Sequence, residues 1–391
     1  MKFSVQRANL LNAVKNALKV VNKNAVIEET RGVYIDADAD NGIISVIGTD
    51  VQSQLQCRIA DGHIEHGGQV VIRPIVAEML ALMDGDIVTL ELCDVQRLLN
   101  ISCGTCQYSV PYMDAKAFPK MQLPFPEDTV CVKGINPLIK RTAFAAQDKT
   151  DDINRKALQF IKITFSSCLA QAEATNGDCG AVAVSRSCAD GKLSLIIHKK
   201  ALQILNGLIK NRSEEMYVGI SGKFAVFMKK DMFFFTMKHS GGYIESSRFI
   251  QLIKPKFRAV LDGRDLYGLT DNVSAIFGAG DDDCINLIID KDRIIMSTKT
   301  AIASCQNSIP SDSNIPTPKD GFNYSARILS EVFRNASGMV TLKLDEKGFL
   351  LLETGDNRYF VGARAPVKIK LKEEKPKKKT KTKKETASAA A

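Results

Sequence analysis

Few residues in this chain have the types and spacing that chemistry requires. The best candidates are Cys103 and Cys106, which enclose Gly104-Thr105 in a CxxC pattern similar to that of redox dithiols. Such motifs usually place the first cysteine near the N-terminus of a helix, which lowers the pKa of its thiol. Here the surrounding RLLNISCGTCQYSV predicts two strands joined by a tight turn. The pattern therefore disfavours a redox role.

A metal site is the other chemistry open to this cysteine pair. His63 and His66 could complete a set of four zinc ligands, but no spacing in the sequence brings the four residues together. The aspartates at 281–283 lack the ligand spacing of a calcium loop and are more typical of a solvated turn. We expect no metal and no cofactor. A thiol or zinc protein that uses Cys103 and Cys106 is kept as an alternative.

Common catalytic motifs are also missing from the sequence. The chain has four histidines, no glycine-rich phosphate loop before a helix, and no nucleophile in a recognisable elbow. We therefore expect that the protein is not an enzyme. Its function must be sought in its binding surfaces.

The elements that would position such surfaces repeat along the chain. Six segments carry apolar residues at helical spacing, and successive equivalent positions are 66, 62, 64, 64 and 62 residues apart. Strand-like runs separated by turn signals fill the intervals. Each repeat is predicted to be one helix with a few short antiparallel strands. The equivalent apolar positions are Leu10, Val76, Leu138, Leu202, Leu266 and Ile328.

The six units are expected to associate in pairs, because one helix on three or four strands leaves sheet edges open and buries too small a core. Pairing gives three similar α+β domains of about 125 residues, within the usual range. Proline-bearing stretches at 118–129 and 253–257 are candidate linkers. The predicted parts are residues 1–122, 127–250 and 256–369, followed by a Lys-rich tail, 370–391, that we expect to be disordered.

Positive charge is concentrated in the helical segments. The formal charge is +9, of which residues 368–391 carry +7, so the body is only +2. The six helical segments hold 12 basic and 4 acidic residues, which leaves the rest of the body at −6. A face lined by these helices would attract phosphates. The residues expected there are Lys15, Lys19, Lys23, Lys140, Arg141, Lys199, Lys200, Arg327 and Arg334.

No device for reading bases accompanies this charge. We find no zinc-finger spacing, no aromatic RNA-binding signature, and no helix dense in the residues used for base readout. Contacts to duplex DNA are therefore expected to involve its backbone and to be independent of sequence. The tail is either a solvated segment or a weak, salt-sensitive nucleic-acid contact.

Composition and cysteine usage indicate a cytoplasmic protein. Hydrophobic residues make up 45% and charged residues 25%, which is ordinary for a globular protein. No apolar stretch approaches the roughly 20 residues that span a bilayer, and residues 1–20 do not form a secretory signal. Ten cysteines, most of them in or beside apolar strand-like runs, suit a reducing compartment.

Several short motifs, in their order, resemble those of one known family. They are the opening MKFSVQRANLLNAV, GTD at 48–50, YSVPYMDAKAFPKM, ATNG at 174–177 and FNYS at 322–325. Together with the repeat, they make the chain similar to the bacterial DNA polymerase III beta subunit, the sliding clamp, to about residue 369. The resemblance implies a DNA-clamp fold with three similar domains per subunit. It also implies that two subunits close head to tail into a ring lined by helices.

The resemblance implies a processivity factor that encircles double-stranded DNA and tethers a DNA polymerase catalytic subunit, with a clamp loader as a further partner. It also implies a homodimer that acts in the cytoplasm, at the nucleoid during replication. It also implies a hydrophobic pocket between the second and third domains for short peptide motifs of partners. Where the family usually has His-Arg-Leu, this chain has Asp178-Cys179-Gly180. A multidomain nucleic-acid-binding protein that forms no ring is the main alternative. By position, the pocket would involve Leu158, Thr175, Gly177, Asn323, Ala365, Pro366 and Val367.

Overall fold

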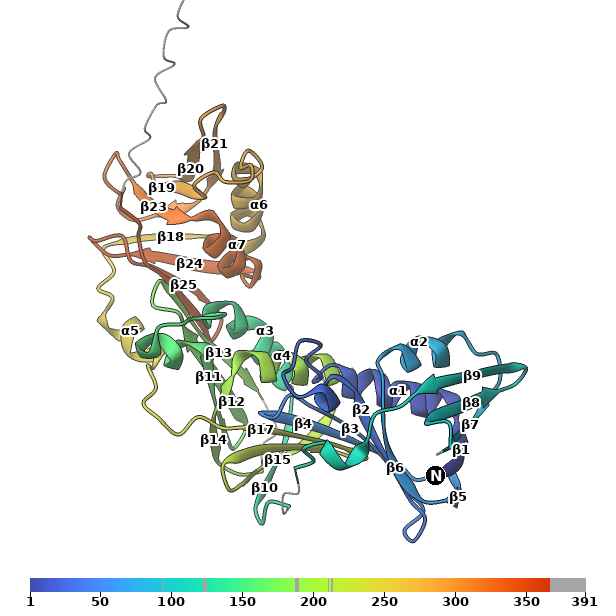
Figure 1. The fold of residues 1–391 in the computed structure, drawn as a ribbon. Coiled ribbons are helices and arrows are strands. Elements are labelled where there is room, and N and C mark those ends of the chain that lie inside the picture. The colour runs from blue at the N-terminus through green and yellow to red at the C-terminus, as the bar shows by residue number, and fades with distance from the viewer. Residues whose placement is uncertain (94, 122–124, 187–189, 210, 212–213, 366–391) are drawn as a thin grey trace, which may run out of the picture.

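The computed structural model describes residues 1–93, 95–121, 125–186, 190–209, 211 and 214–365, which form an arc of helices and strands (Figure 1). In this part of the chain, the α-helices other than α5 lie along the concave side of the arc, and α5 lies on its convex side. The helices in these residues are α1 (Arg7–Leu18), α2 (Ile75–Leu82), α3 (Ile135–Thr142), α4 (Lys199–Leu208), α5 (Ser246–Leu252), α6 (Gly263–Ser274) and α7 (Ala326–Arg334).

The six concave helices are the six predicted segments, and each buries apolar residues in the main core. Five of the six positions taken as equivalent are fully buried. In α7 the fully buried residue is Leu329, and Ile328 is only partly buried, so the chosen position was one residue too early. Helix α5, seven residues long, was not predicted.

The strands form four antiparallel sheets, each named here in spatial order. The first consists of β5 (His63–His66), β1 (Lys2–Gln6), β7 (Ile87–Cys93), β8 (Leu98–Cys103) and β9 (Cys106–Pro111). The second consists of β10 (Thr129–Lys133), β15 (Glu215–Ser221), β16 (Phe224–Lys229), β17 (Met232–Met237), β4 (Ser53–Ile59), β3 (Ile43–Thr49), β2 (Val33–Asp38) and β6 (Gly68–Ile72).

The other two sheets hold the later strands. The third consists of β14 (Leu193–His198), β11 (Phe160–Ser166), β12 (Leu169–Thr175), β13 (Cys179–Arg186), β26 (Asn357–Val361), β25 (Leu350–Thr354), β24 (Met339–Leu344), β18 (Phe257–Asp262) and β22 (Asp312–Ser313). The fourth consists of β21 (Ser304–Pro310), β20 (Arg293–Lys299), β19 (Cys284–Ile289) and β23 (Phe322–Ser325).

Two strand pairings join segments that are far apart in the sequence. In the second sheet β17 pairs with β4, and in the third sheet β13 pairs with β26. Each pairing crosses one of the predicted linker regions, so the two large sheets are shared between successive parts of the arc. A shared sheet buries strand edges that would otherwise be open. The first and fourth sheets, at the two ends of the chain's arc, have no such partner within the described residues.

The cysteine hairpin has the geometry expected from its sequence. Cys103 ends β8 and Cys106 begins β9, directly opposite each other across the Gly104-Thr105 turn. Both thiols are free, and among the described residues no group of three His, Cys, Asp or Glu side chains is placed to hold a metal ion. In the same part of the chain, no helix is both long and apolar enough to span a membrane.

Candidate nucleic-acid interface and partner pocket

The concave helices carry their basic residues on the side away from the sheets. In α1, burial of Leu10, Ala13, Val14 and Ala17 fixes the rotation of the helix, so Lys15 and the cap residue Lys19 face solvent. Lys23, Lys140, Lys200, Arg327 and Arg334 are also exposed, while Arg141 is partly buried.

Polar contacts make this surface continuous from one unit to the next. The Lys19 ammonium donates to the Asn16 side-chain oxygen at 2.9 Å and to the Gly207 carbonyl at 2.8 Å, which links α1 to α4. Farther along, the Arg327 guanidinium lies 4.0 Å from the Asp148 carboxylate, which links α7 to the segment after α3. These contacts hold the basic helices side by side along the concave face.

Lys199 differs from the other predicted basic residues because its side chain is only 9% exposed. Its ammonium donates to the Ala146 carbonyl at 2.9 Å and to the Asp148 carboxylate at 2.7 Å. The hydrogen bond from Lys199 lowers the pKa of Asp148. Lys199 is therefore engaged inside the protein, and it is left out of the surface considered below.

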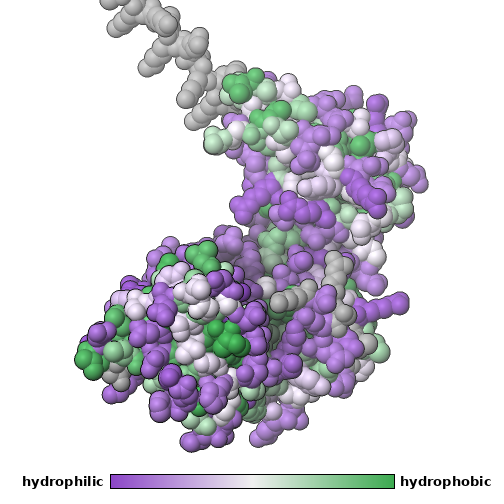
Figure 2. All heavy atoms as spheres, turned by 90° about the vertical axis from the view of Figure 1, so that its right-hand side faces the viewer, coloured by the Kyte–Doolittle hydropathy of each residue, from purple (hydrophilic) through white to green (hydrophobic). Residues whose placement is uncertain are grey.

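The space-filling view supports a polar character for the visible surface. In Figure 2 hydrophilic residues predominate on the face drawn, and hydrophobic residues form small separate patches. Scattered apolar residues of this kind are normal on protein surfaces. A binding surface on this face would therefore depend mainly on charge and hydrogen bonding.

The residues predicted for the partner pocket lie at the start of the β12–β13 turn, in β23 and near the end of the described chain. Thr175 is buried, and its hydroxyl donates to the Cys179 carbonyl at 2.7 Å and accepts the Gly177 amide at 3.1 Å. Gly177 has a φ of +96°, a left-handed conformation that favours glycine. Leu158, in the 3-10 helix Ile153–Gln159, is also buried.

The remaining predicted pocket residues are engaged with their neighbours or lie at the surface. The Asn323 side chain accepts a hydrogen bond from Asn286 at 3.0 Å, and its carbonyl accepts the Arg364 amide at 2.7 Å. Ala365 is exposed, whereas Pro366 and Val367 lie outside the described residues. The predicted tail also lies outside them.

The β12–β13 turn and the last described residues meet at a polar cavity. Gly362 donates its amide to the Asp178 carbonyl at 2.8 Å, which brings the two segments together. Beside them is a cavity of about 890 Å³, which faces α3, α4 and α7. Its lining is largely polar and includes Lys140, Asn176, Asp283, Arg327 and Arg364. It does not have the apolar character expected of the predicted pocket.

Gly180, which stands where the family usually has leucine, changes the shape of the surface in this region. Gly180 lies opposite Phe360 in the β13–β26 pairing, and a Cβ added at Gly180 would clash with the Phe360 ring. The ring therefore occupies the space that a side chain at position 180 would need. Phe360 also stacks on Phe249, with ring centroids 5.9 Å apart.

Comparisons with known proteins agree with this geometry. Residues 1–122 match the family model of the DNA polymerase III beta subunit, N-terminal domain. The beta sliding clamp of Bacillus subtilis is 22% identical over 301 residues, which cover 73% of this chain and 77% of that protein. The match to the family model covers the first 122 residues, and beyond them the chain is similar to this family at low identity.

Solved structures show the same fold over nearly the whole chain. A putative DNA polymerase III beta subunit from Eubacterium rectale has a TM-score of 0.84 at 17% identity, covering 93% of this chain and 99% of that one. The Bacillus subtilis sliding clamp has a TM-score of 0.83 at 19% identity, covering 94% and 100%. The fold is therefore the α+β DNA-clamp fold.

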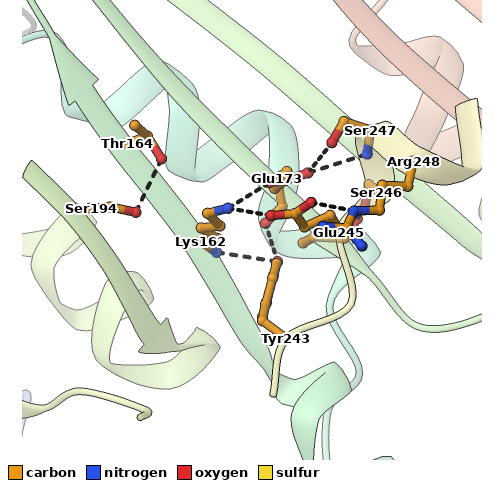
Figure 3. A network of polar contacts seen from close by, with 10 residues as sticks. Lys162, Thr164, Glu173, Ser194, Tyr243, Glu245, Ser246, Ser247 and Arg248 are labelled. Carbon is orange, nitrogen blue, oxygen red and sulfur yellow. Dashed lines mark hydrogen bonds and ion pairs between the residues drawn. The ribbon is translucent and has the colours of Figure 1, made fainter. Parts of the chain in front are cut away.

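Sequence reasoning missed the polar network that fastens α5 of this chain to the third sheet (Figure 3). Glu173 is buried in β12 and accepts hydrogen bonds from the amide and hydroxyl of Ser247. Lys162 lies 2.6 Å from Glu245, and the Tyr243 hydroxyl donates to the Glu173 carbonyl at 2.6 Å. The alternation of apolar and polar residues in β12 is visible in the sequence. The hydrogen-bond partners of Glu173 lie about 70 residues away, where no local pattern indicates them.

Proposed function

We propose that this clamp is a processivity factor that encircles double-stranded DNA as a homodimer and tethers a DNA polymerase catalytic subunit and other partners to it. A clamp loader would open the ring, and the protein would act in the cytoplasm, at the nucleoid during replication. The proposed domains are residues 1–122, 127–250 and 256–369. The observation that carries the proposal is the pair of incomplete sheets at the two ends of the chain's arc.

The strand order supports closure by a second copy of the chain. Each large sheet joins a hairpin with a four-residue turn to a hairpin with a two-residue turn, and the last strands of the two hairpins pair. In the second sheet, β4 of the β3–β4 hairpin pairs with β17 of the β16–β17 hairpin. In the third sheet, β13 of the β12–β13 hairpin pairs with β26 of the β25–β26 hairpin. The hairpins left over are β20–β21, with a four-residue turn, and β8–β9, with a two-residue turn. Both β21 and β9 are edge strands. Joining them head to tail would give a third sheet of the same construction.

Repetition of the hairpins also specifies the register of that junction. In both large sheets, the fourth residue of the four-residue turn faces the fifth residue of the strand that ends the other hairpin. In the second sheet Ser53 faces Thr236 of β17, and in the third sheet Cys179 faces Val361 of β26. The equivalent residues at the open ends are Ala303 and Val110. The rule therefore pairs Ser304 with Ser109, Cys305 with Tyr108, Gln306 with Gln107 and Asn307 with Cys106.

The composition of the two edges favours pairing. Residues 106–111 and 304–310 contain no charged side chain, although exposed edge strands are commonly protected from pairing by lysine or other charges. Tyr108 and Cys305 are partly buried on the core side of their sheets, where the rule places them opposite each other. An unprotected edge with a matching partner is expected to bind a second copy.

The basic residues of the concave face would contact DNA phosphates. The proposed set is Lys15, Lys19, Lys23, Lys140, Arg141, Lys200, Arg327 and Arg334, without the buried Lys199. Because the ring would hold DNA by topology, these contacts can remain weak and exchangeable, which allows sliding. Such contacts carry no base-sequence information.

The test is retention of the protein on closed and cut DNA. Protein loaded onto a nicked circular duplex should stay bound in high salt and be released when a restriction enzyme linearises the circle. Retention that persists after linearisation, or binding that depends only on salt, would contradict the ring and favour a nucleic-acid-binding protein that forms no ring. If a Cys103→Ala, Cys106→Ala variant stimulated DNA synthesis as well as the unchanged protein, the thiol or zinc alternative would be excluded.

A further inference from the structure

A cavity of about 530 Å³ lies where the second and third sheets meet, beside the first turn of α4. The second sheet contributes Thr236 and Met237 to its walls, and the third sheet contributes Phe160 and His198. Lys200 of α4 also lines this α4 cavity and is one of the exposed basic residues of the concave face. The α4 cavity therefore adjoins the surface that is proposed to contact DNA.

Three aromatic rings lie together in the wall of the α4 cavity. Phe160 begins β11 and His198 ends β14, and the two residues pair directly across the sheet with their rings edge to face, 5.3 Å apart between centroids. His239 follows β17, and its ring stacks on Phe160 with centroids 4.4 Å apart. All three residues are only partly buried. They therefore offer a surface on which a further flat ring could stack.

Hydrogen bonds fix the two histidine rings. Nδ1 of His198 accepts the Lys200 amide at 3.2 Å, and the Nε2–H of His239 donates to the Gly242 carbonyl at 3.3 Å. Burial, together with the charges of Lys200 and Lys199, lowers the pKa of His198, so this ring is neutral at pH 7. Rings that are already held in place cost a ligand less ordering entropy than rings that must be ordered on binding.

The acidic residues of the α4 cavity leave its positive charge available to a ligand. Asp50 accepts two backbone amides of its own turn, and Asp148 binds the ammonium of Lys199. Three lysines of the walls are engaged in no ion pair among the described residues, and they would attract a phosphate. They are Lys149, Lys200 and Lys238.

We propose that the α4 cavity binds one unpaired nucleotide, whose base stacks on the rings of Phe160 and His239 and whose phosphate is bound by the three lysines. Every base has a π-face, so this site would not select a sequence. The bases of a duplex are already paired and stacked, and they present no open face to the rings. An acidic peptide would use the lysines and leave the rings without a partner.

Two sources could supply this nucleotide, a single strand of nucleic acid or a free nucleotide. A strand that leaves the encircled duplex could reach the α4 cavity, because Lys200 belongs both to the cavity and to the concave face. For that source the inference rests on the proposed DNA-encircling function. For a free nucleotide it stands without the ring.

The experiment measures binding of the full-length protein to a fluorescein-labelled oligothymidylate of about ten nucleotides, by fluorescence anisotropy at several salt concentrations. His239→Ala should weaken binding about fivefold or more at every salt concentration, because it removes stacking and no permanent charge. Lys238→Ala should instead make the slope of log affinity against log salt about 0.7 less steep, the effect of losing one phosphate contact on a single strand. Lys192→Ala should change neither, since this exposed lysine does not line the cavity.

Competition with unlabelled compounds identifies the ligand. Displacement of the oligonucleotide by deoxythymidine monophosphate would show that a free nucleotide suffices, and its failure alongside the effect of His239→Ala would show that the site takes a strand. Both results support the inference. Equal binding by His239→Ala and the unchanged protein would overturn it. Displacement by inorganic phosphate or hexaglutamate that is as effective as displacement by deoxythymidine monophosphate would overturn it too, because the base would then contribute nothing.

Retention on circular DNA separates this inference from the proposed function. His239→Ala should stay on nicked circles and leave them on linearisation, which also shows that the variant is folded. If it is not retained, Lys238→Ala carries the test through its salt slope. If the unchanged protein were not retained on circles but bound the oligonucleotide through His239, the ring would be wrong and the nucleotide site would stand.

Discussion

The register of the proposed subunit junction can be tested by a charge pair. In that register Gln107 of one subunit faces Gln306 of the other, and both side chains are exposed on the outer face of their sheets. A directly opposed pair of opposite charges contributes about 0.2–1 kcal/mol, and like charges destabilise by a similar amount. A ring has two junctions, so each substitution acts twice. The coupling should total about 0.4–2 kcal/mol, or about 2- to 30-fold in dimer Kd.

The assay is a double-mutant cycle on the dimer dissociation constant, measured by dilution of fluorescently labelled protein or by analytical ultracentrifugation. Gln107→Lys with Gln306→Lys should weaken the dimer more than the sum of the single changes. Gln107→Lys with Gln306→Glu should recover the loss. Both effects should shrink with added salt, because the pair is exposed to solvent.

Matched controls place the charge one step along the same face. Ser304 and Ser308 lie two residues on either side of Gln306, so Gln107→Lys should couple more weakly to Ser304→Glu or Ser308→Glu. A stronger coupling to either would mean that the register has slipped by two residues and that the hairpin equivalence is wrong. No coupling at any of the three positions would remove β21 from the junction.

Three further predictions follow from the site. In Lys200→Ala the negative slope of log affinity for duplex DNA against log salt should become about 0.9 less steep, measured by titration at several salt concentrations. Lys199→Met should leave that slope unchanged but raise the pKa of Asp148, measured by NMR. Because the pKa of Asp148 is lowered in the folded state, this carboxylate stabilises the fold above its unfolded pKa, and the stabilisation is lost as pH falls. The free energy of unfolding of Lys199→Met should therefore fall less on acidification than that of the unchanged protein. The exposed Cys168 should react with a thiol reagent at pH 8, whereas Cys179 should not, because burial raises its pKa to about 12.

Local sequence patterns were sufficient to predict the six concave helices and several of the strands of this fold. An apolar stripe at helical spacing depends only on residues within a few turns, and it located all six concave helices. The error at Ile328 shows the limit, since the adjacent Leu329 satisfies the same pattern and burial decides between them. The β8–β9 hairpin was likewise readable, because two strand-like runs enclose a Gly-Thr turn.

Pairings between distant segments were not predictable from such patterns. Nothing local indicates that Ser53 faces Thr236, although their hydroxyls lie 3.0 Å apart in the second sheet. The same limit applies to charge, because a count of lysines cannot distinguish the buried ammonium of Lys199 from the exposed one of Lys200. Tertiary contact with Ala146 and Asp148 decides that difference.

Charge is distributed among the concave helices according to the sheet beneath them. Helices α1 and α4 belong to the hairpins joined in the second sheet, α3 and α7 to those joined in the third, and all four have a positive formal charge. Helices α2 and α6 each have a net charge of −1, and they precede the hairpins that end in the free edges β9 and β21. In the proposed ring, phosphate attraction would therefore be strongest over the sheets inside each subunit and weakest at the junctions. Salt should release DNA from the basic helices while leaving the uncharged strand pairing intact, so the affinities for DNA and for the second subunit should respond separately to ionic strength.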